Sequence, residues 1–242
     1  MSIKYQAINF FGKFNSLSAK VLFYHDIHKN NKYTYDSTSL ELFNQQILKI
    51  KSLGYDFTNK LPQKSNEVLI CFDDGYKGIY ECKDYIIENK IPVKIFLVTN
   101  KINEPNYLSV KQIVELNNTG LFDFESHTHN HVDVGKTKDK NLILSEVIES
   151  TEFLSQLLGK NVDELCLPHG SFSNFALKII CETRIKNVFT CLPGKAVVKY
   201  RNINLISRSL VQNTEVENIE GVMRSGDSFL RYYYFIKQKN FA

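Results

Sequence analysis

The amino-acid sequence lacks several features that would each mark a particular class of protein. Its five cysteines are odd in number and none are spaced as CxxC, so neither a disulfide framework nor a cysteine zinc site is expected. No apolar run approaches the roughly 20 residues that span a bilayer, and residues 1–20 hold no apolar stretch typical of a secretory signal. These absences predict a cytoplasmic protein with reduced thiols.

A strong charge of one sign is also missing. The 30 Lys and Arg residues exceed the 26 Asp and Glu residues by a formal net charge of +4, and they are spread along the chain. Nucleic-acid binding usually needs a clustered basic face, so no nucleic-acid partner is expected. With 43% apolar and 23% charged residues, the chain has the composition of an ordinary globular protein.

The chain does contain an alternation of short apolar runs and longer stretches with helical spacing. Helical spacing is found between residues 40 and 50 and between 144 and 158, and Gly54 or Gly159 follows as a stop signal. The apolar runs are predicted to be strands, at 21–24, 68–72, 93–98, 121–125, 164–167, 187–191 and 205–210. This alternation predicts an α/β fold with a mostly parallel sheet, open or closed into a barrel. We expect a single domain over residues 1–242, with its core at about 20–210.

Polar residues suited to chemistry follow four of these predicted strands. His25 follows the first strand, Asp73 and Asp74 the second, segment 126–131 the fourth and segment 168–170 the fifth. The carboxyl ends of parallel strands lie on one face of a barrel, where barrel enzymes build their sites. These segments are therefore expected to meet at one mouth of the barrel.

The residue types in these segments are typical of metal and proton chemistry. Asp73 and Asp74 point opposite ways along a strand, so one can bind a metal while the other handles a proton; a surface Asp-Gly turn is the alternative. His127 and His131 are separated by three residues and can present two imidazoles to one metal, although a polar loop would carry the same pattern. His129 is expected to point away, as a loop residue or a substrate contact.

Two weaker signals complete the set. The turn at Pro168 and Gly170 can free a backbone N–H to face a developing oxyanion, but most such turns are only turns. His25 can give a proton to a leaving amine, although a core or surface histidine is the alternative.

Together these motifs resemble those of the polysaccharide deacetylase, or NodB-homology, family. F-D-D-G at 72–75 matches the family's T-F-D-D-G motif with Cys71 in the Thr position, and H-T-H-N-H at 127–131 matches H-[S/T]-x-x-H. L-P-H-G at 167–170 resembles P-Y-G, with His169 where Tyr is usual. V-L-F-Y-H at 21–25 resembles the opening of a branch whose motif order is circularly permuted. Order and spacing agree from about residue 20 to about 210.

The resemblance implies a distorted (β/α) barrel of about seven parallel strands that holds a divalent metal. It implies that Asp74, His127 and His131 are metal ligands and that Asp73 is the general base. Zinc is the default metal, and Co, Ni or Fe suit the same ligands.

The resemblance also assigns the remaining catalytic roles. The backbone N–H of His169 is the implied oxyanion donor. Many family members carry a late catalytic histidine that this chain lacks, so His25 inherits the role of general acid, as in the permuted branch. Many members also have an arginine where this chain has Cys166. Arg208 resembles the arginine of the permuted branch and is expected to orient Asp73.

The implied reaction is metal-dependent hydrolysis of an N-acyl group, usually N-acetyl, on an amino sugar. Amidase activity on a non-sugar substrate and an inactive carbohydrate-binding barrel remain alternatives. A non-haem iron oxygenase could use His131, Asp133 and His169, but such enzymes are usually all-β. A cytosolic enzyme would act on a glycan precursor. The aromatic and basic tail over 228–242 suggests weak peripheral contact with an anionic membrane, with packing of the tail on the barrel as the alternative.

Overall fold

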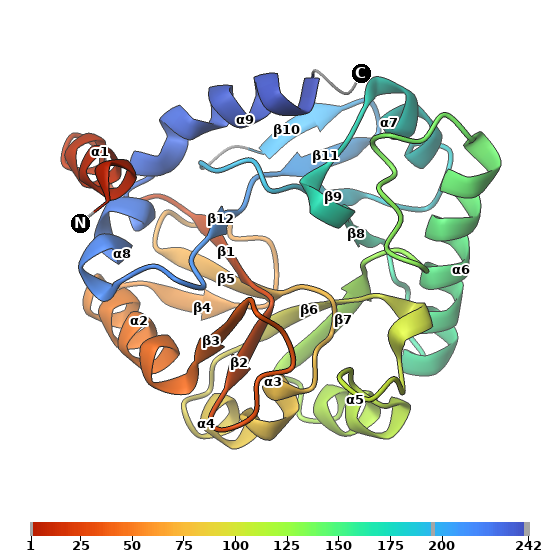
Figure 1. Ribbon diagram of the computed structural model, residues 1–242, viewed down its shortest axis with the longest axis horizontal. Helices are drawn as coiled ribbons and strands as arrows, with labels where there is room; N and C mark the ends of the chain where they lie inside the picture. Colours follow the sequence, from red (N-terminus) through yellow and green to blue (C-terminus); the bar gives the residue numbers. More distant parts are fainter. Residues whose placement is uncertain (1, 195–196, 240–242) are drawn as a thin grey trace.

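The computed structural model describes residues 2–194 and 197–239, and its centre is a curved, mostly parallel sheet (Figure 1). Nine strands are hydrogen-bonded in the order β10-β11-β9-β8-β7-β6-β5-β1-β12, and β4 pairs with β5 outside this path. The pairing of β10 with β11 is antiparallel and the other pairings along the path are parallel. The strands are β1 Lys20–Tyr24, β4 Asp56–Thr58, β5 Glu67–Phe72, β6 Val93–Leu97, β7 Phe122–Ser126, β8 Glu164–Cys166, β9 Asn187–Phe189, β10 Val197–Tyr200, β11 Ile203–Ile206 and β12 Ser209–Leu210.

Helices surround this sheet and connect its parallel strands, which makes the structure a distorted (β/α) barrel (Figure 1). A small second sheet pairs β2 Asp26–His28 with β3 Ser37–Ser39. The helices are α1 Ile3–Gly12, α2 Leu40–Ser52, α3 Gly78–Glu81, α4 Lys83–Glu88, η1 Thr99–Lys101, α5 Val110–Asn117, α6 Lys140–Leu158, η2 Pro168–Gly170, α7 Asn174–Ile180, α8 Val216–Met223, η3 Gly226–Phe229 and α9 Leu230–Lys239.

The sequence patterns explain these elements. Strands β1 and β6 are buried along their whole length, as expected for parallel strands covered on both faces. Helix α2 begins where the Ser39 hydroxyl accepts a hydrogen bond from the N–H of Leu42. Helix α6 ends at Gly159, whose φ of 63° is left-handed and favours glycine. The predicted α/β barrel and both predicted helices are therefore confirmed.

The predicted strand at 205–210 is wrong, because the chain breaks it at Arg208. Ile206 ends β11, which pairs with β9, whereas Ser209 begins β12, which pairs with β1. The segment thus crosses between the two end regions of the sheet, and Arg208 turns its side chain into the barrel. Strands β2, β3, β4 and β10 were not predicted, because they are short and partly polar.

The cores lie on both sides of the sheet. A cluster inside the barrel contains Phe23, Phe96 and Phe189, together with buried aliphatic and thiol side chains from neighbouring strands. A larger cluster packs the outer face of the sheet against the helices. The guanidinium carbon of Arg208 lies 5.6 Å from the centre of the Phe96 ring, so this inner cluster borders the barrel mouth.

The C-terminal aromatic and basic segment forms η3 and α9, which lie along one side of the barrel (Figure 1). The guanidinium of Arg231 donates to the Ser207 hydroxyl at 2.6 Å, so the start of α9 contacts the barrel. Residues 240–242 of the predicted tail lie outside the described residues. No described helix is long and apolar enough to cross a membrane.

Candidate active site

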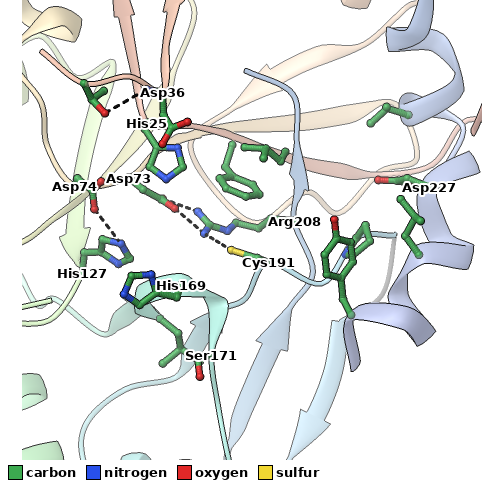
Figure 2. A pocket seen from close by; sticks show the side chains of 18 of the residues that line it. His25, Asp36, Asp73, Asp74, His127, His169, Ser171, Cys191, Arg208 and Asp227 are labelled. Carbon is green, nitrogen blue, oxygen red and sulfur yellow. Dashed lines mark hydrogen bonds and ion pairs between the residues drawn. The ribbon is translucent and has the colours of Figure 1, made fainter. Parts of the chain in front are cut away.

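The polar segments that follow the strands do meet at one mouth of the barrel. A cavity of about 540 Å³ opens there, within the 300–1,000 Å³ range typical of small-molecule sites. Figure 2 shows residues that directly follow β1, β5 and β7, together with residues of the β8–α7 connection, facing this cavity. Its lining includes every site residue predicted from the sequence, namely His25, Asp73, Asp74, His127, His131, His169 and Arg208.

One carboxylate and two imidazoles form the first cluster in this cavity. Oδ1 of Asp74 lies 3.3 Å from Nε2 of His127 and 3.3 Å from Nε2 of His131. Asp74 follows β5 with a left-handed φ of 71°, and His131 has a φ of 61°, so the histidines come from a loop rather than a helix. The local turns after two strands therefore bring three ligand atoms within 4.8 Å of one another.

The surroundings of the imidazoles suit a metal site. Nδ1 of His127 lies 2.8 Å from the carbonyl oxygen of Cys166, which can only accept, so Nδ1 carries the proton and Nε2 is free to bind. Burial, and next the nearby His127, lower the pKa of His131 to about 4, which keeps that ring neutral at neutral pH. Burial alone would lower the pKa of His127, but its hydrogen bond with Asp74 outweighs this effect and raises it. Two imidazole nitrogens and one carboxylate are a ligand set that fits a divalent metal with borderline ligand preference.

Asp73 lies beside this cluster but is held by a different partner. Nη1 of Arg208 donates to Oδ1 of Asp73 at 2.6 Å, and Nη2 donates to Oδ2 at 2.8 Å. Burial alone would raise the pKa of Asp73, but the Arg208 guanidinium outweighs this effect and lowers it to about 2. Asp73 and Asp74 thus have different partners, and the division of their catalytic roles stays a prediction.

Arg208 is itself fixed from several sides. Its Nε donates to the carbonyl of Thr190 at 3.0 Å, and its Nη2 lies 3.0 Å from the sulfur of Cys166. Its guanidinium carbon lies 4.3 Å from the centre of the Phe23 ring, within the range of a cation–π contact. Arg208 thus lies beside Cys166, and Cys166 is the position at which many members of the polysaccharide deacetylase family have an arginine.

His25 is oriented by residues that the sequence did not reveal. Its Nδ1 lies 2.7 Å from Oε1 of Gln212, an acceptor, so Nδ1 donates and Nε2 is the remaining ring nitrogen. The amide of Gln212 donates in turn to Oδ1 of Asp36 at 3.0 Å, which fixes the orientation of the amide. A lone Gln and a lone Asp in separate loops carry no local signal of such a role.

His169 lines the cavity, whereas His129 does not. The ring centre of His169 is 4.9 Å from that of His131, and its left-handed φ of 57° marks the tight turn at the end of β8. Nδ1 of His129 is 2.8 Å from the Thr99 hydroxyl, and its Nε2 is 3.6 Å from Glu149. His129 is absent from the lining of the cavity, so it points away from the metal cluster, as expected.

A second acidic group, formed by Asp123, Glu125 and Glu164, lies outside this cavity. Nζ of Lys94 is 2.6 Å from Glu164, and Nζ of Lys160 is 3.0 Å from Glu125. These ammonium groups already fill the space that a cation would take, so this group is a charge network within the barrel wall.

Comparisons with known proteins agree with this geometry. The family model for polysaccharide deacetylase matches residues 60–188. A poly-beta-1,6-N-acetyl-D-glucosamine N-deacetylase of Staphylococcus aureus (strain MRSA252) is 29% identical over 244 aligned residues, covering 86% of this chain and 83% of the relative. The protein of the same name from Staphylococcus epidermidis is 33% identical over 180 residues, covering 69% of this chain and 61% of the relative.

Solved structures share the fold. The Streptococcus pyogenes deacetylase PplD in complex with acetate has a TM-score of 0.73 at 23% identity, covering 86% of this chain and 99% of that one. IcaB from Ammonifex degensii has a TM-score of 0.73 at 19% identity, covering 87% of this chain and 98% of that one. These likenesses confirm the barrel.

An α/β barrel with carboxylate and imidazole groups at its mouth is typical of a hydrolase. The chain belongs to the polysaccharide deacetylase family and is an enzyme of that class, which hydrolyses amide bonds in acylated sugars. The mixed α/β sheet also argues against the all-β oxygenase alternative.

Proposed function

We propose that this protein is a metal-dependent N-deacetylase that removes N-acetyl groups from β-1,6-linked N-acetylglucosamine during the synthesis of a surface polysaccharide. The observation that carries the proposal is the cluster of Asp74, His127 and His131 beside Asp73 and His25 in one cavity. The substrate is taken from the named activity of the staphylococcal relatives.

Asp74, His127 and His131 would hold the metal, with zinc as the default. Held there, a divalent metal would supply Lewis acidity, which would polarise the acetyl carbonyl and make the attacking water more acidic. Nδ1 of His127 keeps its bond to the carbonyl of Cys166 and so keeps Nε2 directed at the cluster.

The other side chains move protons and stabilise charge. Asp73 accepts the proton of the attacking water, and Arg208 keeps this carboxylate ionised and fixed in position. The N–H of His169, for which no hydrogen-bond partner is found within the described residues, is available to donate to the oxyanion. His25 protonates the leaving amine from Nε2, while Gln212 holds its Nδ1. Acetate and a free amino sugar are the products.

The test is acetate release from β-1,6-linked N-acetylglucosamine oligomers by the metal-loaded protein. We expect wild type to release acetate and His127→Ala to lose nearly all of this activity. His129→Ala is the matched control, because His129 lies in the same loop but contacts Thr99 and Glu149 instead of the cluster. Failure of the wild type to release acetate, or equal losses in the two variants, would contradict the proposal.

A further inference from the structure

The cavity continues well beyond the carboxylate and imidazole cluster. In Figure 2, Asp74 and His127 lie on one side of Arg208, and Asp227 lies on the other side, near the C-terminal helices. We call this second part the seam arm. Its lining side chains come from α1, β12, α8 and α9, and they are Tyr5, Ile8, Leu210, Val222, Leu230 and Tyr234.

The seam arm lies where the sheet ends at β12 and helices cover its edge. Strand β12 is the last strand of the hydrogen-bonded path, and α1, α8 and α9 pack along that side of the barrel (Figure 1). Leu230 and Tyr234 are four residues apart on α9, so they share one face of the helix. Tyr5 and Ile8, three residues apart on α1, do the same. The two helices thus turn these apolar and aromatic side chains toward the arm, and Lys4 of α1 lines it as well.

Two polar side chains of the seam arm, Asp227 and Tyr5, already have partners within the protein, and the Lys4 ammonium lies 5.3 Å from the centre of the Tyr5 ring. Asp227 pairs with the buried ammonium of Lys20 at 3.3 Å and accepts from the Ser209 hydroxyl at 2.5 Å. The hydroxyl of Tyr5 is 2.8 Å from that of Thr214. A sugar ring would find few groups here, chiefly the Tyr234 hydroxyl and the Lys4 ammonium, to replace its hydrogen bonds to water, whereas a hydrocarbon chain loses none. The lining therefore favours an alkyl or isoprenoid chain.

The position of the arm indicates whether it contacts the amine-bearing sugar or the acyl group of the substrate. Leu210 is paired with Phe23 between β12 and β1, and the ring of Phe23 is 6.1 Å from that of His25. The arm therefore joins the site on the side of His25, the proposed acid for the leaving amine. A group bound there is attached to the amine-bearing sugar and not to the acyl group.

From this geometry we infer that the seam arm binds a hydrocarbon chain attached to the amine-bearing sugar, so that the preferred substrate is a lipid-linked glycan. This inference rests on the proposed function and adds the class of substrate. It also gives a role to α1, α8 and α9, which lie outside the residues 60–188 matched by the family model.

The test compares two disaccharides of β-1,6-linked N-acetylglucosamine, a methyl glycoside and an octyl glycoside, with the metal-loaded enzyme. Each methylene that leaves water contributes about fourfold, so entry of only two methylenes into the arm raises kcat/KM by about 15-fold. Tyr234→Ala should reduce the octyl-to-methyl ratio of kcat/KM several-fold. Tyr233→Ala is the matched control, because Tyr233 is the neighbouring residue, 61% exposed and absent from the lining, and should keep the ratio.

Two results would overturn the inference while leaving the proposed function intact. One is equal kcat/KM for the two glycosides. The other is a preference for an N-octanoyl over an N-acetyl methyl glycoside, which would place the arm on the acyl side. If neither glycoside is hydrolysed, the proposed function fails instead, and calorimetry still tests the arm. The octyl glycoside must then bind more tightly than the methyl glycoside and lose this advantage in Tyr234→Ala.

Discussion

The buried pair of Asp73 and Arg208 should show strong coupling when its members are replaced singly and together. The side chains of Arg208 and Asp73 are only 0% and 4% exposed, so either residue alone would be an uncompensated buried charge. Removing one partner of such a pair costs about 3–5 kcal/mol. At about 2–4 °C per kcal/mol for a chain of this size, Asp73→Asn or Arg208→Met should lower Tm by about 6–20 °C.

The double variant, Asp73→Asn with Arg208→Met, removes both charges of this pair and should recover most of the lost stability. It should not recover activity, because the proposed base is absent and its loss costs about 10²–10⁴ in rate. Thermal denaturation and acetate release on the same four proteins separate the two effects. The exposed pair of Lys140 and Glu182 is the control, since its side chains are 51% and 52% exposed and Lys140→Met should change stability by less than about 1 kcal/mol.

The pair also predicts the direction of acid destabilisation. Arg208 lowers the pKa of Asp73 to about 2, below its ordinary value of 3.8, so the stabilisation is present above pH 3.8 and is lost as pH falls toward 2. Additive losses of stability in the double variant would refute the reasoning. So would a difference in stability between the wild type and Asp73→Asn that is the same at pH 5 and at pH 2.

Three further predictions concern other parts of the site. Asp74→Ala and His127→Ala should each lose bound metal in elemental analysis, because two ligands are too few; full retention in both would remove the ligand assignment. His25→Ala should lower the rate by about 10²–10⁴, and Gln212→Ala by less, because the ring keeps Nε2 but loses its orientation; near-normal turnover by His25→Ala would exclude its role as acid. Burial raises the pKa of Asp26 to about 7, so the wild type loses stability as pH rises from about 4 to 7. Asp26→Asn should gain stability relative to the wild type over that range in denaturant unfolding, and a constant difference would disprove this.

The amino-acid sequence by itself determined the α/β alternation and most of the candidate metal site. Buried parallel strands read as short apolar runs, and their ends are marked by short polar motifs. Because parallel strands deliver their carboxyl ends to one face, Asp74, His127 and His131 could be placed together without knowledge of their contacts. The left-handed turns at Asp74 and His131 completed that placement locally.

Only the tertiary structure decided the partners that surround this cluster. Arg208 breaks a predicted strand because the chain crosses from the β9 side to the β1 side of the sheet, which no local pattern records. Gln212 and Asp36 contact His25 through loops distant in sequence. The seam arm is built by helices from the two ends of the chain, with Tyr5 and Tyr234 as lining residues. Such contacts depend on how the helices pack at a sheet edge, and ordinary apolar and amide side chains give no sign of them in the sequence.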